Sequence, residues 1–229
     1  MESVAGVEKY EAVVIGATGL TGSHLLEQLL EDPDYDAVVT LSRKRINNKH
    51  PKHTNYLADL FDTSTYENHI TADHLFICTG TTQDKTPDEQ EYYKIEHDLP
   101  LTVAKTALEN GVKKVVVISA LGASPDSRFR YNRSKGEMER DIEALGFEES
   151  YFVQPALIGG DRDEKRIFET AWKKFQKLID PLLIGFLKKY RTIHPRTIAQ
   201  SMIFLAKNGY HETRIESDEL KSLARKQAH

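Results

Sequence analysis

Tyr131 and Lys135 are the residues best suited to chemistry: they stand four positions apart at the start of a predicted helix and so share one helix face. A tyrosine hydroxyl, with an ordinary pKa of about 10, is a poor proton shuttle at neutral pH, but an adjacent ammonium group stabilises the phenolate and lowers that pKa. Ser119 comes shortly before them, at the carboxyl end of a predicted strand, and could hold a carbonyl oxygen by a hydrogen bond. We predict that Tyr131 moves a proton, Lys135 tunes it and Ser119 positions a substrate. The alternative is a surface tyrosine beside a charged neighbour.

A glycine-rich turn near the start of the chain supplies a second pattern. Residues 12–30 read AVVIGATGLTGSHLLEQLL, a short apolar strand, a Gly-x-x-Gly-x-x-Gly turn and a helix. Glycines let the backbone approach a pyrophosphate, and the free N–H groups of a helix start bind phosphate oxygens. We predict a dinucleotide site, in which the hydroxyls of Thr18 and Thr21 bind phosphate or cap the helix. The residues assigned to this turn are Gly16, Thr18, Gly19, Leu20, Thr21 and Gly22.

Positions after the next strands complete the predicted cofactor site. The second strand leads into Arg43 and Lys44, without the acidic residue that would bind the ribose hydroxyls of NAD. Arg43, assisted by Lys44, suits a 2′-phosphate, so we predict NADP; the alternative is a solvated basic loop. The positive nicotinamide ring of the oxidised cofactor would lower the pKa of Tyr131 further. The contacts expected at the ends of the third and fourth strands are Asp59, Leu60, Cys78, Thr79 and Gly80.

The composition is typical of one soluble domain. The chain has 229 residues, of which 39% are hydrophobic and 29% charged, and we take residues 1–229 as a single domain. The acidic N-terminal sequence lacks an apolar signal region and the apolar runs are too short to span a bilayer, so we expect a cytoplasmic protein without membrane contact. A net charge of −4 argues against nucleic acid as a partner. The single cysteine, most simply a buried thiol, and the scattered histidines predict neither a disulfide nor a metal site.

Strand-like and helical segments alternate along the chain. The predicted strands after the first are 37–41, 55–60, 74–80, 114–120 and 151–160. The predicted helices are 20–30, 88–110 with an interruption at Pro100, and 131–145. This alternation predicts an α/β Rossmann-type fold with a doubly wound parallel sheet. A helical pattern marks a small substrate-side segment at 159–195, after which a helix, a short strand and a final helix follow.

Four stretches, GATGLTG, ISALGA, YNRSKGEME and QPALIGG, occur in the order found in atypical short-chain dehydrogenase/reductases. The chain resembles the HIV Tat-interactive-protein-like oxidoreductases of that group, from about residue 10 to residue 220, and CTGTTQDK is its most distinctive stretch. The resemblance implies a Rossmann fold that binds NADP(H), with Ser119, Tyr131 and Lys135 as the active-site serine, tyrosine and lysine. It also implies that Pro155 and Leu157, within QPALIGG, lie against the cofactor.

One departure concerns the asparagine that many short-chain reductases carry in the helix before the serine-bearing strand. Here that stretch is 94–98, where His97 or Asp98 could substitute, although Asp98 equally suits a helix cap. We predict an NADP(H)-dependent reductase of a small carbonyl compound. Some proteins of this type are described as regulatory, so a dinucleotide sensor that acts through a protein partner is the alternative. A nucleotide-sugar epimerase is less favoured, because the segment after Gly160 is short.

Overall fold

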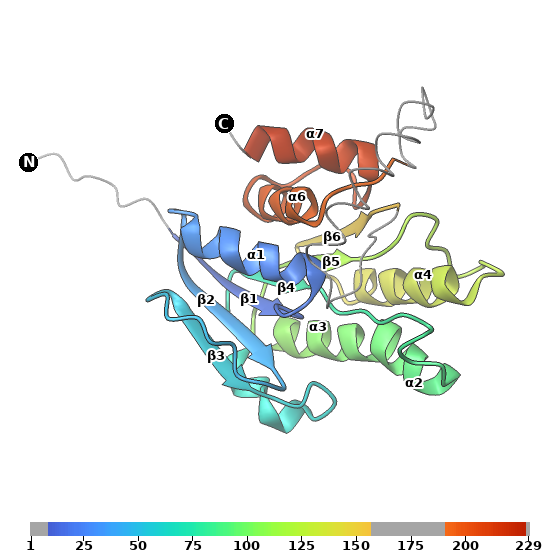
Figure 1. Ribbon diagram of the computed structural model, residues 1–229, viewed down its shortest axis with the longest axis horizontal. Helices are drawn as coiled ribbons and strands as arrows, with labels where there is room; N and C mark the ends of the chain where they lie inside the picture. The colour runs from blue at the N-terminus through green and yellow to red at the C-terminus, as the bar shows by residue number, and fades with distance from the viewer. Residues whose placement is uncertain (1–8, 157–190, 228–229) are drawn as a thin grey trace, which may run out of the picture.

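The computed structural model describes residues 9–156 and 191–227. Within these residues the strands form one parallel sheet of seven strands in the order β3-β2-β1-β4-β5-β6-β7 (Figure 1). The strands are β1 (Tyr10–Ile15), β2 (Tyr35–Ser42), β3 (His53–Leu57), β4 (His74–Ile77), β5 (Lys114–Ile118), β6 (Glu149–Gln154) and β7 (Arg214–Glu216). This order confirms the predicted Rossmann-type, doubly wound fold.

The sheet reverses its direction of growth between β1 and β4. From β1 the chain adds β2 and β3 on one side, and then it returns to place β4 on the other side. Ile15 at the end of β1 pairs with Leu41 of β2 and with Ile77 of β4, so the carboxyl ends of these strands meet. In sheets of this kind the reversal opens a crevice beyond the strand ends, which is where ligands bind.

Three helices cover one face of the sheet: α1 (Leu20–Glu31), α6 (Pro195–Asn208) and α7 (Ser217–Gln227) (Figure 1). In α1, Leu25 and Leu29 are one helical turn apart and fully buried, and they belong to the same apolar core as Ile198 and Met202 of α6. Full burial of each such side chain contributes about 1.5–3 kcal/mol. The α1 helix is thus fixed on the sheet by its leucines, which sets the direction of its N-terminus. The helix, strand and helix predicted for the last part of the chain are confirmed.

The opposite face of the sheet carries α3 (Leu99–Glu109) and α4 (Arg130–Glu143). Met138 of α4 packs in one core with Val115 and Val117 of β5. The alternate residues of the same strand, Val116 and Ile118, belong to the core under α1 and α6. Because successive side chains of a strand point to opposite faces, this alternation also decides where the residues just past β5 point.

The predicted helix at 88–110 is divided into three parts. It comprises α2 (Glu89–Tyr93), a π-helical turn at Lys94–Asp98 and then α3. Pro100 lacks the N–H that would bond to the carbonyl oxygen of Glu96, and in a regular α-helix its ring would collide with that oxygen. The wider turn relieves this clash, and the N–H of Leu99 donates to the carbonyl of Lys94. The predicted interruption near Pro100 is confirmed.

Several strands end earlier than predicted. The strands β4, β5 and β6 end at Ile77, Ile118 and Gln154, so Cys78 and Ser119 are the first residues of the loops beyond them. In β6 the ladder stops before a proline, which has no N–H to donate. Leu157 and most of the predicted substrate-side segment 159–195 lie outside the described residues.

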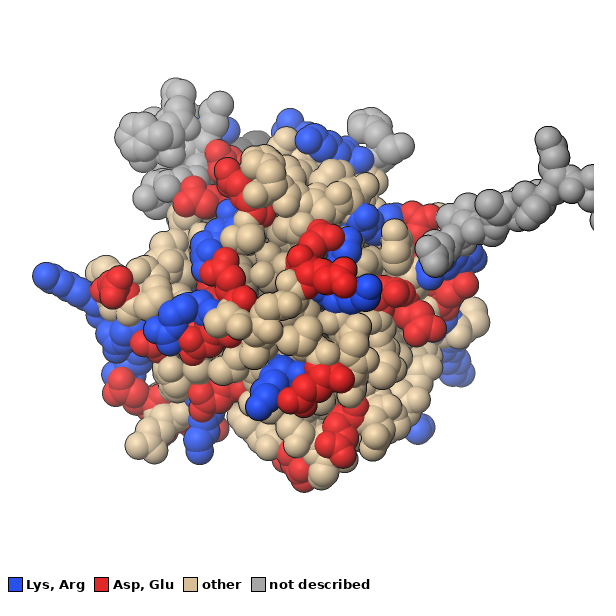
Figure 2. Space-filling model, turned by 180° about the vertical axis from the view of Figure 1, so that it is seen from behind, with Lys and Arg blue, Asp and Glu red and all other residues tan. Residues whose placement is uncertain are grey.

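The surface shows no large region of one charge on the face seen in Figure 2. Basic and acidic side chains are interspersed there. None of the described helices combines the length and the apolar character needed to cross a bilayer.

Candidate active site

A cavity of about 240 Å³ lies at the reversal of the sheet, beyond the carboxyl ends of β1, β4 and β5, and we call it the cleft. It is lined by Gly19, Leu20, Thr21, Cys78, Thr79, Gly80, Thr81, Thr82, Lys85, Glu96, Ile118, Tyr131 and Lys135. The predicted glycine turn, the end of β4 and the predicted tyrosine–lysine pair therefore share one cavity.

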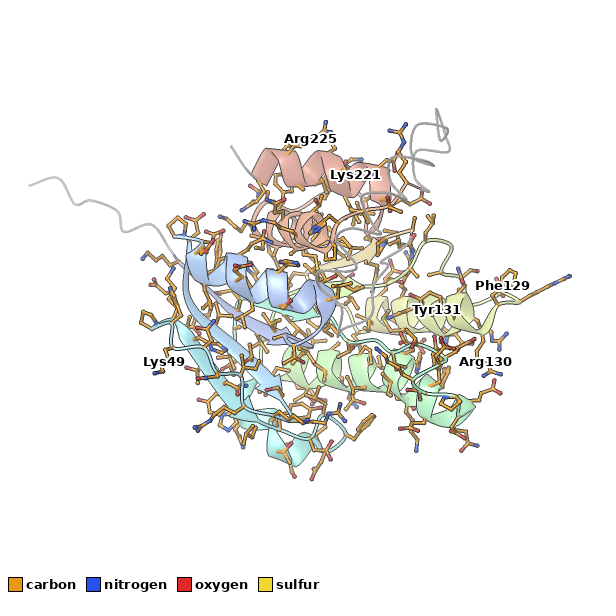
Figure 3. All side chains as sticks on the ribbon, in the orientation of Figure 1. Lys49, Phe129, Arg130, Tyr131, Lys221 and Arg225 are labelled. Carbon is orange, nitrogen blue, oxygen red and sulfur yellow. The ribbon has the colours of Figure 1, made fainter. Side chains whose placement is uncertain are left out.

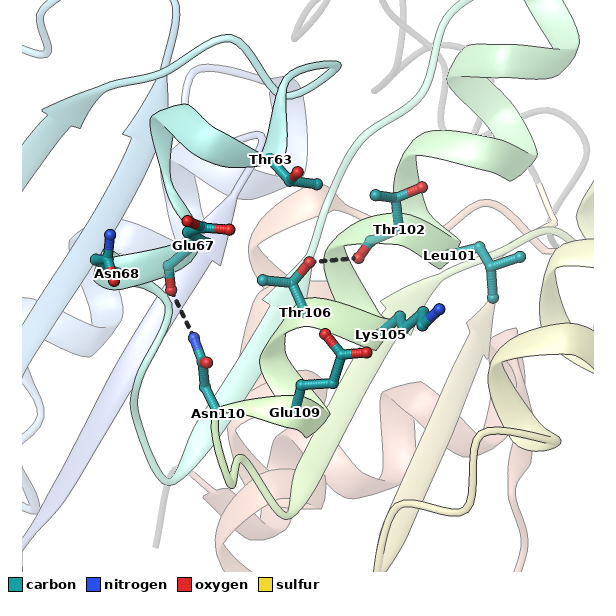
Figure 4. A pocket seen from close by; sticks show the side chains of 9 residues that line it. All are labelled: Thr63, Glu67, Asn68, Leu101, Thr102, Lys105, Thr106, Glu109 and Asn110. Carbon is teal, nitrogen blue, oxygen red and sulfur yellow. Dashed lines mark hydrogen bonds between the residues drawn. The ribbon is translucent and has the colours of Figure 1, made fainter.

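A larger hollow, of about 480 Å³, lies between α3 and two short 3-10 turns, η1 (Thr63–Thr65) and η2 (Glu67–His69) (Figure 4). Across it, Asn110 Nδ2 donates to the carbonyl oxygen of Glu67 at 2.6 Å. The walls of this hollow contain none of the residues predicted for a site. Size alone does not make a ligand site, so we assign the candidate site to the cleft.

Backbone contacts require two of the glycines beside the cleft. Gly16 has a φ of +80°, and a Cβ there would lie 2.6 Å from the carbonyl oxygen of Cys78. A Cβ at Gly22 would lie 2.2 Å from the carbonyl oxygen of Gly16, because α1 packs closely on the turn that precedes it. Gly19 is the N-cap of α1, and no side chain caps the helix there. The first N–H groups of α1 are thus left to the cleft, which is an arrangement suited to a phosphate.

The walls after β1 and β4 also present hydroxyl groups. Thr21 and Thr79 line the cleft, whereas Thr18 is exposed outside it. Thr79 Oγ1 is buried without a hydrogen-bond partner, an arrangement that is unfavourable unless a ligand or water supplies one. Burial raises the pKa of the neighbouring Cys78 thiol to about 12, so Cys78 remains a neutral thiol at physiological pH.

Tyr131 and Lys135 lie on the first turns of α4, and both line the cleft. Figure 3 labels Tyr131 on this helix. Lys135 is buried, and its Nζ lies 2.9 Å from Glu96 Oε2 and 3.2 Å from the carbonyl oxygen of Ile118. Tyr131 keeps 39% of its surface exposed. Desolvation, assisted by the Glu96 carboxylate, raises the pKa of the Tyr131 phenol above its ordinary value. The expected lowering of this pKa is therefore not found, because desolvation dominates and the Glu96 carboxylate adds to it.

Glu96 is a charged residue of the cleft that was not predicted from the sequence. There His97 or Asp98 was expected to face the active site, but the His97 ring is held elsewhere. Its Nδ1 lies 2.8 Å from Asp98 Oδ1, and its Nε2 lies 2.9 Å from Asp141 Oδ2 on α4. Glu96, one position earlier, contacts Lys135 instead. The sequence signal was present as an acidic residue in the relevant stretch, but the π-helical turn that orients it is not visible in the spacing.

Ser119 does not line the cleft with the tyrosine–lysine pair. Its hydroxyl donates to the carboxylate of Glu139, which also accepts from Gln154 Nε2 at 2.9 Å and from Arg214 Nε at 2.8 Å. We call these four residues the Glu139 cluster. Ser119 is buried and is not among the residues that line the cleft, although Ile118 is. The structure thus gives the Ser119 hydroxyl an interior partner in place of the predicted contact with a substrate.

The basic residues predicted to select NADP are exposed just past β2. Arg43 and Lys44 both reach solvent, while the turn beneath them is fixed by side chains. Ser42 Oγ donates to the carbonyl oxygen of Lys44 at 2.8 Å, and Asn55 Nδ2 donates to Ser42 Oγ at 2.8 Å. These bonds hold the turn while leaving both basic side chains accessible to an anionic group.

Three further predicted cofactor residues do not line the cleft. Asp59 is exposed, and its Oδ1 accepts from the N–H of Phe61 at 3.1 Å. Leu60 packs partly against the core under α3 and α4. Pro155 is buried, and its carbonyl oxygen accepts from the N–H of Leu121 at 3.1 Å. In the part of the chain that the structure describes, no three histidine, cysteine or acidic side chains are arranged to hold a metal ion.

Comparison with known proteins identifies the family. Residues 12–142 match the NAD dependent epimerase/dehydratase family. Protein fmp52, mitochondrial, from Aspergillus clavatus is 40% identical over 167 residues, which cover 69% of this chain and 70% of the relative. A UDP-N-acetylglucosamine 4-epimerase from Methanobrevibacter ruminantium aligns with a TM-score of 0.66 at 18% identity, over 91% of this chain and 76% of that one. A short chain dehydrogenase from Burkholderia cenocepacia in complex with NADP has the same TM-score at 16% identity, over 97% and 94%.

The relatives correct the expected location. Similar proteins from Aspergillus clavatus, Aspergillus terreus and Eremothecium gossypii are named mitochondrial, and so the prediction of a cytoplasmic protein is wrong. That prediction relied on an acidic N-terminal sequence, which argues only against a secretory signal. The family match spans more than half of the chain and includes the glycine turn, Glu96 and the tyrosine–lysine pair. This chain belongs to the NAD dependent epimerase/dehydratase family.

Proposed function

We propose that this protein is an NADP(H)-dependent oxidoreductase that reduces a small carbonyl compound or a similarly polarised substrate. One observation carries the proposal: the uncapped start of α1 and the Tyr131–Lys135 pair line the same cavity. A phosphate site beside a proton-donating pair suits a dinucleotide whose reactive end lies near the pair. The same family includes dehydratases and epimerases, which also use a bound dinucleotide.

The residues of the cleft fit a dinucleotide on two further counts. Gly16 and Gly22 let the turn pack directly on the backbone of Cys78 and on the start of α1, which fixes the uncapped helix end beside the cleft. Thr79 Oγ1 is a buried hydroxyl that lacks a partner. In this proposal the glycine turn and α1 hold the pyrophosphate, and Lys135 binds ribose hydroxyls. When bound, the nicotinamide would supply the hydride.

Tyr131 acts as the acid in the proposed reduction. A carbonyl group that receives hydride at its carbon needs a proton at its oxygen. The pKa of the Tyr131 phenol is raised, so at neutral pH the hydroxyl holds the proton that the oxygen requires. Lys135, one turn along the same helix, stabilises the phenolate that remains. Ser119 has no substrate contact in this scheme, because its hydroxyl is bonded to Glu139.

A cofactor titration tests the proposal directly. Calorimetry with NADPH and NADH, on wild type and on Arg43→Ala, compares the two cofactors. We expect Arg43→Ala to weaken NADPH binding about tenfold, because a charge-assisted hydrogen bond to a phosphate is lost, and to leave NADH nearly unchanged. Arg225→Ala is the matched control, since Arg225 is an exposed arginine on α7 (Figure 3). Failure of both nucleotides to bind the wild type would contradict the proposal.

The family description favours nucleotide-sugar epimerisation as a second candidate. The two reactions differ in their use of the cofactor, because a reduction consumes NADPH whereas an epimerisation restores it. NADPH absorbance with a panel of carbonyl compounds would report the first reaction, and isomerisation of a nucleotide sugar without net oxidation would report the second. Cofactor binding without either reaction would favour a dinucleotide sensor of the Tat-interactive-protein-like type. From the names of the relatives, we propose that the protein works in mitochondria.

A further inference from the structure

Glu96 is an acidic residue buried inside the cleft wall. Its side chain is 1% exposed, and Oε2 lies 2.9 Å from the Nζ of Lys135, which is itself 3% exposed. Its other oxygen, Oε1, accepts from the backbone N–H of Thr81 at 2.5 Å. One carboxylate thereby joins the lysine of α4 to the loop that follows β4.

The backbone around Glu96 is built to bring this carboxylate to the cleft. The π-helical turn that precedes Pro100 orients Glu96 toward Lys135, while His97 bonds to α4. At Gly80, a Cβ would lie 3.4 Å from Glu96 Oε1, which is ordinary van der Waals contact, so the Gly80 backbone packs beside the carboxylate. A buried carboxylate with such support is held in place, since its alternative positions would leave Lys135 unpaired.

Few other charges face this part of the cleft among the described residues. At the rim, Arg130 of α4 is paired with Glu89 of α2 at 3.0 Å, so these two charges offset one another. Lys85 lines the same cavity from the loop and has interactions of its own. The Glu96–Lys135 pair is the buried ion pair beside Tyr131, and its net charge is zero when both groups are ionised.

We propose that Glu96 is a positioning residue that neutralises Lys135, so that the reactive end of the cleft is electrically balanced and accepts oxidised cofactor as readily as reduced cofactor. This inference rests on the proposed function. The nicotinamide ring of oxidised cofactor carries one positive charge more than the reduced ring does. An uncompensated Lys135 would repel the oxidised form alone, whereas the pair treats the two forms alike. The raised pKa of Tyr131 agrees with this balance, because Glu96 also acts on the phenol.

The test measures the ratio of the dissociation constants for NADP⁺ and NADPH. It compares wild type, Glu96→Gln, Lys135→Met and the double variant, by calorimetry at one fixed pH for all four proteins. We expect Glu96→Gln to raise the ratio about tenfold, as for one unit charge in a partly shielded site. Lys135→Met should lower it, and the double variant should return it near the wild-type value. Loss of a ribose contact weakens both forms equally and leaves the ratio unchanged.

A glutamate far from the cleft provides the control for this test. Glu109→Gln removes an exposed carboxylate at the far end of α3, beside the hollow of Figure 4, and should leave the ratio unchanged. If wild type binds both forms but the ratio stays constant through Glu96→Gln and Lys135→Met, the inference is wrong and the proposed function stands. If wild type binds neither form, the proposed function itself fails. Should Glu96→Gln not fold, Lys135→Met against the double variant still decides the sign.

Discussion

Two glutamates of this protein are equally buried, yet their surroundings differ. Glu96 and Glu139 each keep 1% of the side chain exposed. Glu139 accepts hydrogen bonds from three side chains of its cluster, in the layer between α4 and the sheet. Glu96 has one backbone N–H and the ammonium of Lys135, and its Oε2 makes no hydrogen bond beyond that ion pair. Only Glu96, of the two, lines the cleft.

The contrast distinguishes a structural charge from one that can meet a ligand. A buried carboxylate surrounded by donors is satisfied within the protein, and removing it leaves those donors unpaired. A carboxylate at a cavity wall acts on whatever enters the cavity, because the field of a partly buried charge is weakly screened. We therefore expect changes in the Glu139 cluster to alter stability, and changes in the cleft to alter binding and turnover.

The largest expected effect is on turnover and comes from the cleft. In Tyr131→Phe the substrate oxygen loses its proton donor, so we expect kcat to fall about a thousandfold, within the usual range for a general acid. The melting temperature and the NADPH affinity should hardly change, because Tyr131 is 39% exposed and lies on the surface of the first turn of α4. Steady-state kinetics with a carbonyl substrate, beside a thermal melt, measures both.

The matched control for this substitution is Tyr56→Phe. Tyr56 stacks on His69, with ring centroids 3.8 Å apart, and lies on β3 outside the cleft. Its hydroxyl should be dispensable for turnover. If Tyr131→Phe retained full turnover in a protein that consumes NADPH, another group would have to donate the proton. The assignment of turnover to the tyrosine of the cleft would then be wrong.

The next effect is on stability and comes from the Glu139 cluster. Glu139→Ala leaves Ser119 and Gln154 buried without their acceptor and Arg214 without one of its partners, so we expect a loss of about 3 kcal/mol in the free energy of unfolding. Glu139→Gln keeps one acceptor oxygen and should lose about 1 kcal/mol. Urea unfolding gives both values. Glu148→Ala, which breaks an exposed pair with Lys113, should change the free energy by less than about 0.5 kcal/mol.

NADPH affinity separates the two regions in the same variants. Glu139 does not line the cleft, so folded Glu139→Gln should bind NADPH within about twofold of wild type, a difference well below one hydrogen bond. If Glu139→Gln kept its stability but lost cofactor binding, the Glu139 cluster would belong to the ligand site instead. Ser119 would then again be a candidate for a ligand contact.

The fold was predictable because it depends on patterns that the sequence displays fully. Apolar strands, helices with spaced leucines and a glycine turn alternate in one order, and parallel sheets follow from that order. Tyr131 and Lys135 were found for a similar reason, since four-residue spacing in a helix fixes a shared face wherever the helix lies. The direction of Ser119 also follows a pattern, but a different one. Along β5, Val115 and Val117 face α4, and Ser119 continues that side of the strand.

Glu96 could not be placed from the sequence. Each residue of a helix turns by about 100°, so the inserted residue of a π-helical turn redirects every side chain near it. An unbroken α-helix from 88 to 110 gives different faces to Glu96 and His97 than the observed turn does. Pro100 signals that the helix is disturbed but not how, because a kink, a break and a wider turn all relieve the same clash.

The smallest expected effect is on the pH dependence of stability. It separates Glu139 from Glu143, a neighbouring glutamate outside the Glu139 cluster. Arg214 is paired with both Glu139 and Glu143. Burial raises the pKa of Glu139 in the folded protein despite its hydrogen bonds, whereas the hydrogen bond from Arg214 lowers the pKa of Glu143, which is half-exposed. The contributions of these two carboxylates to the free energy of unfolding therefore change with pH in opposite directions, although both carboxylates pair with the same guanidinium.

The direction in which each glutamate changes stability with pH follows from proton linkage. A carboxyl whose pKa is raised by folding binds its proton more tightly in the native state, so its contribution is greatest below the ordinary value of about 4.3 and is lost as the pH rises through the raised value. For Glu143 the contribution is present above about 4.3 and is lost as the pH falls through the lowered value. Urea midpoints measured across this range should therefore show that the advantage of wild type over Glu139→Gln shrinks with rising pH. The advantage over Glu143→Gln should grow with rising pH. Slopes of the same sign in both variants would mean that burial does not dominate the pKa of Glu139.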